Sequence, residues 1–351
     1  MKRGIIAMSG GVDSSVAALR MLQQGDRLQG VTLLLQSKAA DACGSGSDAA
    51  DAAKVCEKLN IPHETWDLRQ TFRQQVQDRF CACYRGGGTP NPCIDCNRYL
   101  KFGAMLDRAL EAGWDYIASG HYARVNWDES RGRWVLKKGL DESKDQSYVL
   151  YSLTQHQLAH LRLPLGELRK EQVRAMAAEQ GFASANRPDS QDICFVPDGD
   201  YTAFLQQHTG QALTPGNFVL AETGQVLGKH RGMEAYTIGQ RKGLGIAWSE
   251  PLYVVDKRAE DHAVLLGRNS DLFRTRLEAG DCNWIAMESL TEPMRVTART
   301  RYHQTETAAT ISPLPDGGVE AVFDTPIRAI TPGQAVVFYQ GDLVVGGGTI
   351  R

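Results

Sequence analysis

Two stretches of the chain combine residue types that can do chemistry, and the first lies near the N-terminus. Residues 7–15 read AMSGGVDSS and follow the apolar run 4–6. A strand, a glycine-rich turn and a helix would leave backbone N–H groups at a helix start, where the helix dipole favours an anion such as phosphate. The lysine of the usual phosphate-binding loop is absent. Asp13 is therefore expected to hold Mg²⁺ on a pyrophosphate group, because a bare carboxylate would repel phosphate. The plainer alternative is a turn that only caps a helix.

The second stretch places cysteines in front of a predicted helix. Residues 89–103 read TPNPCIDCNRYLKFG, and the residue before each proline avoids helical angles, so this segment begins extended or turned. Cys96 then falls near the helix start, where a thiolate is favoured and the thiol pKa is expected to drop below its ordinary value of about 8.5. Cys194 lies in DSQDICF, residues 189–195. Taken alone, Cys194 suits a buried apolar position better than it suits a nucleophile.

Composition is typical of a folded protein with a reducing, cytoplasmic location. The chain has 351 residues, 42% hydrophobic and 23% charged, with a formal net charge of −2. Its length suggests about two or three domains. No run of ~18 apolar residues predicts a membrane span, and no export signal is recognisable. Eight cysteines without an export signal indicate chemistry or metal binding rather than a disulfide framework. The near-neutral charge gives no global sign of a nucleic-acid partner, although it leaves room for a local basic surface.

The elements that must position these residues alternate between strand and helix in the first half. Residues 4–8 and 31–35 are short apolar runs typical of strands buried on both faces. Helical spacing follows residue 12 and continues over 48–59 and 102–112, with further strands expected at 61–68 and 116–118. This alternation predicts an α/β domain with a parallel sheet, whose ligands bind beyond the carboxyl ends of the strands. After about residue 205, short runs between glycine-rich turns predict small all-β modules.

The motifs, taken together, resemble a known family. Residues 9–14, SGGVDS, resemble the pyrophosphate-binding loop of the N-type ATP pyrophosphatases, which cleave ATP to AMP and pyrophosphate while adenylating an acceptor. The chain as a whole is similar to the tRNA-specific 2-thiouridylase family over essentially its full length. The matching segments, in order, are 9–14 (SGGVDS), 91–97 (NPCIDCN), 119–123 (SGHYA), 144–148 (KDQSY), 189–195 (DSQDICF), 236–245 (YTIGQRKGLG) and 331–334 (TPGQ).

The resemblance implies a fold and a division into domains. We expect an α/β, parallel-sheet N-type ATP pyrophosphatase domain, of the adenine nucleotide alpha-hydrolase-like kind, over residues 1–208. Two small β-rich domains should follow, a central one over 209–271 and a C-terminal β-barrel over 272–351.

The resemblance also assigns binding residues. ATP is expected to contact Ala7, Met8, Ser9, Gly10, Gly11, Val12, Asp13, Ser14, Leu33 and Gly120. A tRNA, with its wobble uridine flipped out as base-modifying enzymes require, is expected to contact Asn91, Pro92, Cys93, His121, Lys144, Asp145, Gln146, Arg301, Tyr302 and Gln334. Arg295 and Arg299 share strand parity with Arg301, and for these two a solvated face and an RNA contact are equally good interpretations.

The chemistry that the resemblance implies uses both singled-out cysteines. The C2 oxygen of the uridine attacks the α-phosphate of ATP and becomes an adenylate. Cys194 carries a persulfide received from a sulfur-relay protein or a cysteine desulfurase, and Cys96 is the partner nucleophile. Pyrophosphate and AMP leave, and 2-thiouridine forms. The two cysteines end as a disulfide, which a reductant must reopen.

One position departs from the family and keeps alternatives open. Position 93 is Cys where many members carry Asp. Cys81, Cys83, Cys93 and Cys96 could then bind Zn²⁺, or Cys93, Cys96 and Cys194 could hold an iron–sulfur cluster that presents sulfur to the base. Two further alternatives are an ATP pyrophosphatase acting on a small metabolite and a tRNA-binding protein with a vestigial loop. The small β modules and the paired cysteines count against the metabolite enzyme, and the intact SGGVDS loop counts against the vestigial tRNA-binding protein.

Overall fold

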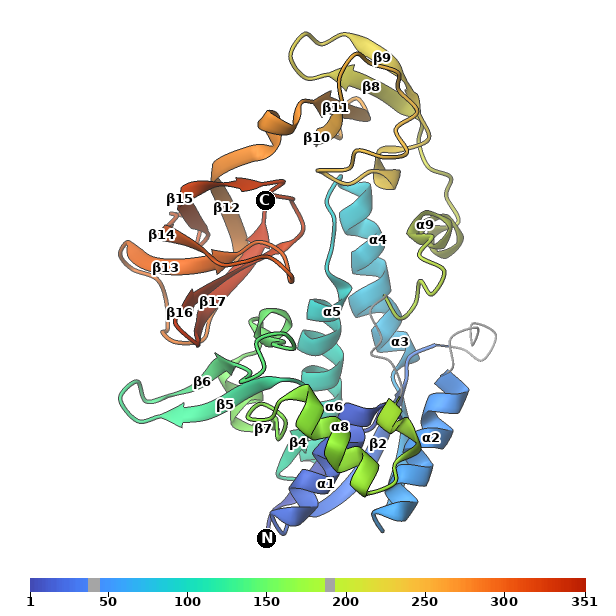
Figure 1. Cartoon of the computed structure of the whole chain (residues 1–351), viewed down its shortest axis with the longest axis vertical. Coiled ribbons are helices and arrows are strands. Elements are labelled where there is room, and N and C mark those ends of the chain that lie inside the picture. Colours follow the sequence, from blue (N-terminus) through green and yellow to red (C-terminus); the bar gives the residue numbers. More distant parts are fainter. Residues whose placement is uncertain (37–44, 187–192) are drawn as a thin grey trace.

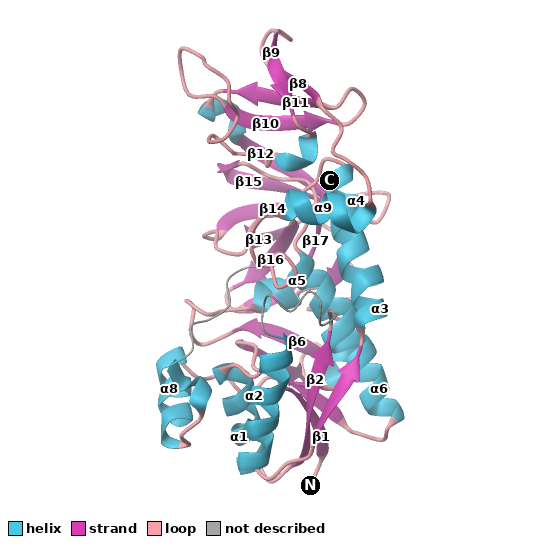
Figure 2. Ribbon diagram, turned by 90° about the vertical axis from the view of Figure 1, so that its right-hand side faces the viewer, coloured by secondary structure: helices cyan, strands magenta, loops and turns pink. Residues whose placement is uncertain are grey.

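The computed structural model describes residues 1–36, 45–186 and 193–351. Three β-sheets follow one another along the long axis of the molecule (Figure 1, Figure 2). The N-terminal sheet is parallel and carries helices, whereas the other two are built mainly of antiparallel strands. The predicted fold class, α/β followed by small β-rich domains, is confirmed. Among the helices of these described ranges, none has the length and apolarity needed to cross a membrane.

The parallel sheet has five strands in the order β3-β2-β1-β4-β7. These strands are β1 (Arg3–Ala7), β2 (Arg27–Leu34), β3 (His63–Asp67), β4 (Tyr116–Ala118) and β7 (Leu161–Arg162). The helices packed around them are α1 (Val12–Gln23), α2 (Ser45–Lys58), α6 (Met105–Glu111) and α8 (Lys170–Glu179). Strand β1 lies at the centre, between β2 and β4, so the glycine-rich loop that follows it emerges at the middle of the sheet.

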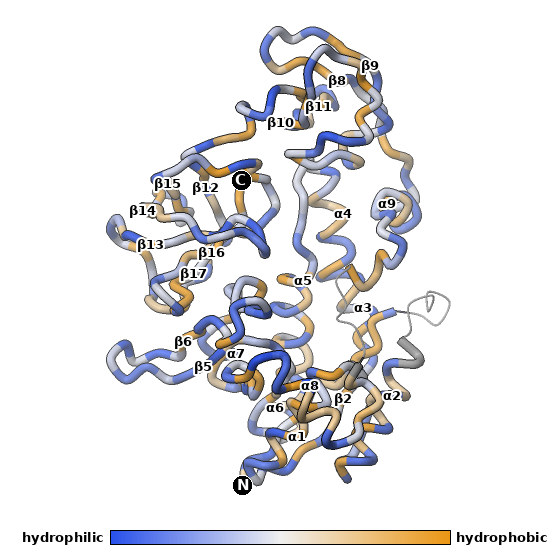
Figure 3. Tube along the Cα trace, viewed as in Figure 1, coloured by the Kyte–Doolittle hydropathy of each residue, from blue (hydrophilic) through white to orange (hydrophobic). Residues whose placement is uncertain are grey.

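Alternation along β1 sends neighbouring side chains into different cores. Ile6 packs with Val16 of α1 and with residues of α2 and α8 on one face. Ile5 packs on the other face with Met105 of α6, and that core continues into the C-terminal barrel at Val337. Figure 3 shows hydrophobic segments in the region of α1, α2 and β2, while the tip of the hairpin formed by β5 (Ala123–Asp128) and β6 (Arg133–Lys138) is hydrophilic. The first domain and the barrel therefore share one core.

Two long helical stretches rise from this sheet toward the other domains (Figure 1). One joins α3 (Arg69–Phe72) through a π-helical turn to α4 (Asp78–Arg85), and the other joins α5 (Pro92–Asp95) through a π-helical segment at 96–104 to α6. The sequence predicts the second helix only over 102–112. It begins ten residues earlier because Asn91 caps it, accepting a hydrogen bond from the Cys93 N–H at 3.2 Å, and because Pro92 fits the first helical position without losing a hydrogen bond.

The remaining elements form the two β-rich units and short helices. The central sheet, in the order β10-β11-β8-β9, contains β8 (Gly216–Leu220), β9 (Val226–His230), β10 (Tyr253–Arg258) and β11 (Ala263–Gly267). The C-terminal strands are β12 (Phe273–Trp284), β13 (Met294–Arg299), β14 (Thr307–Pro313), β15 (Val319–Arg328), β16 (Ala335–Gln340) and β17 (Leu343–Ile350). Pairing of β12 with both β15 and β17 closes these six strands into a barrel. Short helices α7 (Gln155–Ala159) and α9 (Tyr201–Thr209) lie in the connections.

A hairpin from the first domain extends the barrel sheet. Strands β5 (Ala123–Asp128) and β6 (Arg133–Lys138) pair with each other, and β6 pairs with β17 through Lys137 and Leu343. The division of the chain into domains at 1–208, 209–271 and 272–351 stays a prediction. In space, this hairpin belongs to the sheet of the last segment.

Candidate active site

The loop between β1 and α1 is held in shape by its own hydroxyl groups. Gly10 has a φ of +73°, and a Cβ there would lie 2.7 Å from the carbonyl oxygen of Asp48, so the position requires glycine. The Ser14 hydroxyl accepts from the Ser9 N–H at 3.3 Å and donates to the Gly11 carbonyl at 3.1 Å. Gly11 is the N-cap of α1. The loop thus presents a helix start that is suited to an anion, as the sequence predicts.

The Asp13 carboxylate has protein partners that the sequence does not reveal. The Lys170 Nζ atom lies 2.8 Å from both carboxylate oxygens, and the Tyr122 hydroxyl donates to Oδ1 at 2.8 Å. Lys170 is the first residue of α8 and is buried, whereas the Asp13 side chain is 32% exposed. Tyr122 belongs to a motif that the sequence singles out, but Lys170 belongs to none of them. The expected magnesium ligand is therefore already neutralised by a lysine.

The residues expected to bind ATP meet at one edge of the parallel sheet. Ala7 ends β1, Leu33 lies near the end of β2, and Gly120 follows β4, and these three strands are adjacent. Gly120 packs directly on the loop, since a Cβ at this position would lie 2.7 Å from the Asp13 carbonyl carbon and 2.9 Å from the Ser14 nitrogen. The carboxyl ends of adjacent parallel strands are where α/β proteins bind ligands.

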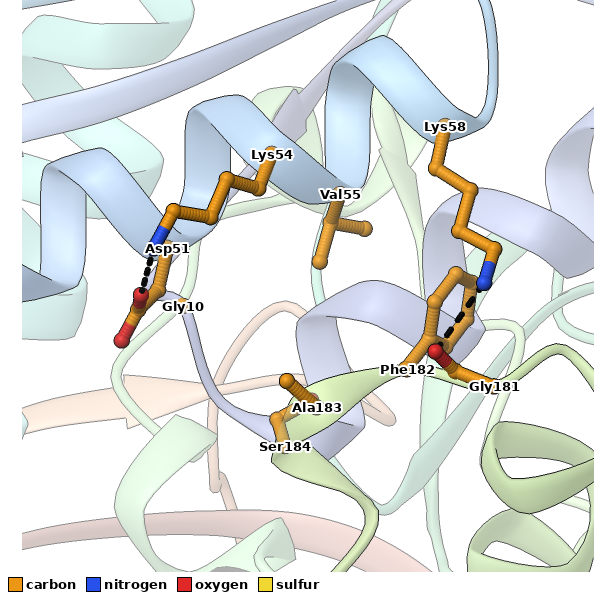
Figure 4. Close-up of a pocket in the computed structure, with 9 residues that line it drawn as sticks. All are labelled: Gly10, Asp51, Lys54, Val55, Lys58, Gly181, Phe182, Ala183 and Ser184. Atoms are coloured by element: carbon orange, nitrogen blue, oxygen red, sulfur yellow. Dashed lines mark hydrogen bonds and ion pairs between the residues drawn. The ribbon is translucent and has the colours of Figure 1, made fainter.

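A cavity of about 320 Å³ lies behind this loop, between α2 and the turn after α8 (Figure 4). Gly10 is the one predicted nucleotide residue in its lining. Lys54 pairs with Asp51 at 3.3 Å, and the Lys58 ammonium donates to the Gly181 carbonyl at 3.0 Å. Both lysines are thus engaged with protein oxygens in the wall of the cavity.

Cys96 differs from its expected state. Because the helix begins at Pro92, Cys93 occupies the first turn and is exposed, while Cys96 lies one turn further on and is buried. Its side chain packs in an apolar cluster with Phe80 and Phe195. Burial raises the pKa of the Cys96 thiol, so the expectation of a lowered pKa is wrong. Desolvation outweighs the helix dipole here.

Cys194 and Cys96 interact, and a lysine stands beside them. Burial of the thiol and, to a smaller extent, the negative charges of Cys96 and Cys93 together raise the pKa of Cys194 to about 12, although the residue as a whole is exposed. The positive charge of Lys101 lowers the pKa of both Cys194 and Cys96. Lys101 lies five positions after Cys96 in the π-helical segment, where such a spacing places residues on one face. Lys101 lies within residues 89–103, but no pattern in the sequence marks it as a neighbour of the thiols.

His121 links the nucleotide loop to these thiols. It follows Gly120, its Nδ1 atom lies 2.7 Å from the Ser119 hydroxyl, and its ring centroid lies 5.5 Å from that of Phe102. Burial, with the charge of Lys101, holds the pKa of His121 well below its ordinary value. His121 is therefore neutral at pH 7, which suits a hydrogen-bonding role better than a charged contact with phosphate.

The cysteines near the helix start do not gather into a metal site. Cys81 packs in the apolar cluster around Phe80, whereas Cys83 lies against Gly88 and Gly333. Burial raises the pKa of both thiols to about 11. Across residues 1–36, 45–186 and 193–351, no group of three or more His, Cys, Asp or Glu side chains is arranged to hold a metal ion. This geometry does not favour the zinc alternative.

Three of the residues expected to contact tRNA line a second cavity, of about 400 Å³, which lies between the barrel, the central β-rich unit and the segment before α5 and which we call the junction cavity. Its lining consists of Thr89, Thr237, Arg301, Tyr302, His303, Gln304, Thr331 and Gln334. The Gln334 amide donates to the carbonyl oxygens of Thr89 (2.7 Å) and Pro90 (3.2 Å) and so ties the barrel to the segment before α5. Tyr302 lies close to Cys93. Burial raises the pKa of Tyr302 to about 12, and the negative charges of Asp145 and Cys93 contribute to this rise.

Arg301 is anchored to both β-rich units. Its Nη2 atom donates to the carbonyl oxygens of Ile238 (3.3 Å) and Ala329 (3.1 Å) and to the Thr331 hydroxyl (2.8 Å). Arg299 is likewise engaged, with Glu306 at 2.8 Å and Asp145 at 3.3 Å. Arg299 is therefore not part of a solvated face, whereas the Arg295 side chain is 60% exposed in its ion pair with Asp324.

The segment 144–146 braces the site from behind. Asp145 is buried, and its carboxylate accepts from the Gly139 N–H (3.0 Å), the Ser147 N–H (3.1 Å) and the Ser147 hydroxyl (2.9 Å), besides Arg299. The Gln146 side chain accepts from the Tyr122 N–H at 2.9 Å. Lys144 is half-buried in the same turn. The expected residues Asp189 to Asp192 lie outside the described part of the chain.

Comparison with known proteins covers the whole chain. A family model described as the tRNA methyl transferase HUP domain matches residues 2–198, a tRNA methyl transferase PRC-barrel domain matches 202–268, and an aminomethyltransferase β-barrel domain matches 274–350. The tRNA-specific 2-thiouridylase MnmA of Acetivibrio thermocellus is 49% identical over 357 residues, which cover 100% of this chain and 99% of that protein. The enzyme of the same name from Symbiobacterium thermophilum is 48% identical over 360 residues, covering 100% of this chain and 92% of that protein.

Proposed function

The chain belongs to the family of the tRNA-specific 2-thiouridylases, and on this premise we propose that it is a tRNA-uridine 2-sulfurtransferase that thiolates the wobble uridine of tRNA anticodons at the expense of ATP. The observation that carries the proposal is the continuity between the nucleotide loop and the thiols. Gly120 packs on Asp13 and Ser14. The next residue is His121, and the positive charge of Lys101 lowers its pKa as well as the pKa values of Cys96 and Cys194.

The reaction begins with activation of the base. The C2 oxygen of the uridine attacks the α-phosphorus of ATP, the bond to the β-phosphate oxygen breaks, and pyrophosphate leaves. Backbone N–H groups at the start of α1 would stabilise the negative charge of that leaving group. The product is a base adenylate, in which AMP is a good leaving group at C2.

Sulfur transfer follows through two cysteines. The terminal sulfur of a Cys194 persulfide, supplied by a sulfur-relay protein or cysteine desulfurase, attacks C2 and expels AMP. The Cys96 thiolate then attacks the Cys194 sulfur, the bond to the transferred sulfur breaks, and 2-thiouridine is released. The electron pair of that bond stays with the thiouridine, so the enzyme is left with a Cys96–Cys194 disulfide that an external reductant must reduce. The effect of the Cys96 charge on the pKa of Cys194 supports this pairing.

The base and its tRNA would occupy the surface that leads to these thiols. Asn91, Pro92 and Cys93 form the capped start of α5, and Tyr302 beside Cys93 opens onto the junction cavity. The cavity has hydroxyl, amide and imidazole groups, which suit the polar edges of an extruded nucleotide. Arg301 and Gln334 are proposed to contribute from the wall of this cavity, and His121 from the segment that follows the nucleotide loop contact at Gly120.

Anaerobic incubation with tRNA, Mg²⁺–ATP and a sulfur donor tests the proposal. Nucleoside analysis should detect 2-thiouridine, and AMP and pyrophosphate should form in equal amounts only when tRNA is present. Cys194→Ser and Cys96→Ser should both abolish thiolation, while Cys282→Ser, which changes a half-buried thiol in the barrel, should not. Pyrophosphate release without tRNA but with a small metabolite would replace the proposal with a metabolite-adenylating enzyme.

A further inference from the structure

The contacts of Asp13 raise a question that the proposed reaction leaves unanswered. The loop lies at a helix start that already favours an anion, yet it contains a carboxylate, and the fold brings a lysine from 157 positions away to neutralise it. Burying an ammonium group requires a partner, and a buried ion pair adds little net stability. Stability alone therefore gives no reason for this pair.

The position of Lys170 is fixed from several sides. Its own backbone N–H donates to the Asp141 carboxylate at 2.9 Å, which anchors the first turn of α8. Its ammonium lies 5.6 Å from the centroid of the Tyr122 ring, over which a cation is attracted. Tyr122 is in turn held by two hydrogen bonds with Gln146, both of 2.9 Å. The lysine is thus presented to the loop as a preorganised cation.

We propose that Lys170 is the cationic residue of the nucleotide site, which binds the pyrophosphate part of ATP, and that Asp13 acts on the nucleotide by holding Lys170 at the loop. This assignment rests on the proposed function in taking ATP as the nucleotide. A usual phosphate-binding loop contains its own lysine. Here Lys170 supplies the corresponding positive charge from α8. Asp13 is then a positioning residue, whereas the sequence suggests a magnesium ligand. The Asp13 side chain is 32% exposed and that of Lys170 is 9% exposed, so the ion pair reaches the surface mainly through the carboxylate.

The first test compares nucleotides that differ in the pyrophosphate group. Titration calorimetry with Mg²⁺–ATP and with AMP, without tRNA, measures binding separately from thiolation. Lys170→Gln should weaken ATP binding about 10- to 100-fold, as expected for loss of a charged hydrogen bond, and leave AMP binding within about two-fold. Lys170→Arg should recover part of the ATP affinity. Lys138→Gln removes a half-buried, ion-paired lysine in the barrel sheet and should change neither affinity.

The second test asks whether Asp13 acts through Lys170. If it does, Asp13→Asn should weaken ATP binding, and the double variant Asp13→Asn/Lys170→Gln should bind ATP no more weakly than Lys170→Gln alone. Additive losses would mean that Asp13 contacts the magnesium–nucleotide complex independently, and they would overturn the positioning role. Equal losses for AMP and ATP in Lys170→Gln, or an unchanged ATP affinity, would overturn the role of Lys170. Failure of the wild-type protein to bind ATP would instead contradict the proposed function.

Discussion

Gly120→Ala is the substitution whose effect on the nucleotide loop follows most directly from distances. The added Cβ would lie 2.7 Å from the Asp13 carbonyl carbon and 2.9 Å from both the Asp13 Cβ and the Ser14 nitrogen. None of these atoms can rotate away, because they belong to the backbone or are attached to it. Ordinary contact begins at 3.4 Å, so the loop and the segment after β4 must separate by about 0.7 Å. The φ of Gly120 lies outside the left-handed region, so contact alone opposes alanine.

The expected result is a displaced loop in a folded protein. Overpacking of this kind costs about 1–3 kcal/mol of unfolding free energy, and a shift approaching 1 Å at a reacting group costs up to about 100-fold in rate. We expect kcat/KM for ATP, measured as tRNA-dependent pyrophosphate release, to fall roughly 10- to 100-fold. Gly86→Ala is the control, since its nearest atoms lie at 3.5 and 3.6 Å and its φ is −75°. A Gly120→Ala enzyme with wild-type ATP kinetics would refute the close packing of Gly120 on the loop.

Three further predictions concern the thiols and the domain junction. Because the pKa of Cys194 is raised to about 12, its thiolate fraction still grows at pH 10, and its rate of reaction with iodoacetamide should keep rising through that pH. Mass spectrometry of the alkylated peptide measures this rate, and a rate that reaches a plateau below pH 9.5 would contradict the prediction. Arg301→Ala should lower the free energy of unfolding, measured in urea, by about 1–3 kcal/mol because it removes hydrogen bonds to Ala329 and Thr331. The control Arg295→Ala removes an exposed ion pair and should cost less than about 1 kcal/mol. Equal effects of the two substitutions would mean that Arg301 does not join the domains. Cys93→Asp should retain thiolation activity, measured together with the iron content of the same anaerobic preparation. If the variant loses both its activity and its bound iron, the cluster alternative is favoured.

The nucleotide loop was predictable because its geometry is local. A strand, a glycine-rich turn and a helix are set by residues close in sequence, and strand order in a parallel α/β sheet brings Leu33 and Gly120 to the same edge. Lys170 could not be found in this way, because it is distant from Asp13 in the chain and no motif contains it. A single sequence carries no signal for such a long-range ion pair.

The state of Cys96 depended on tertiary packing. Its place near a helix start suggested a lowered pKa, but Asn91 moves the helix start upstream, and Cys96 is buried in one apolar cluster with Phe80 and Phe195. Burial on that scale depends on segments far apart in the sequence. The union of the β5–β6 hairpin with the barrel escaped prediction for the same reason, since it pairs Lys137 with Leu343, which lie far apart in the sequence.

Transfer of a labelled sulfur atom tests the central claim, that Cys194 delivers sulfur to the activated uridine. The protein is loaded with a ³⁴S-labelled persulfide, freed of excess sulfide, and mixed anaerobically with tRNA and Mg²⁺–ATP for a single turnover. Mass spectrometry of the nucleosides and of the cysteine peptides then follows the label. Our account predicts one ³⁴S in 2-thiouridine for each one lost from Cys194, together with a Cys96–Cys194 disulfide. Thiouridine that contains unlabelled sulfur while the label remains on Cys194 would contradict it.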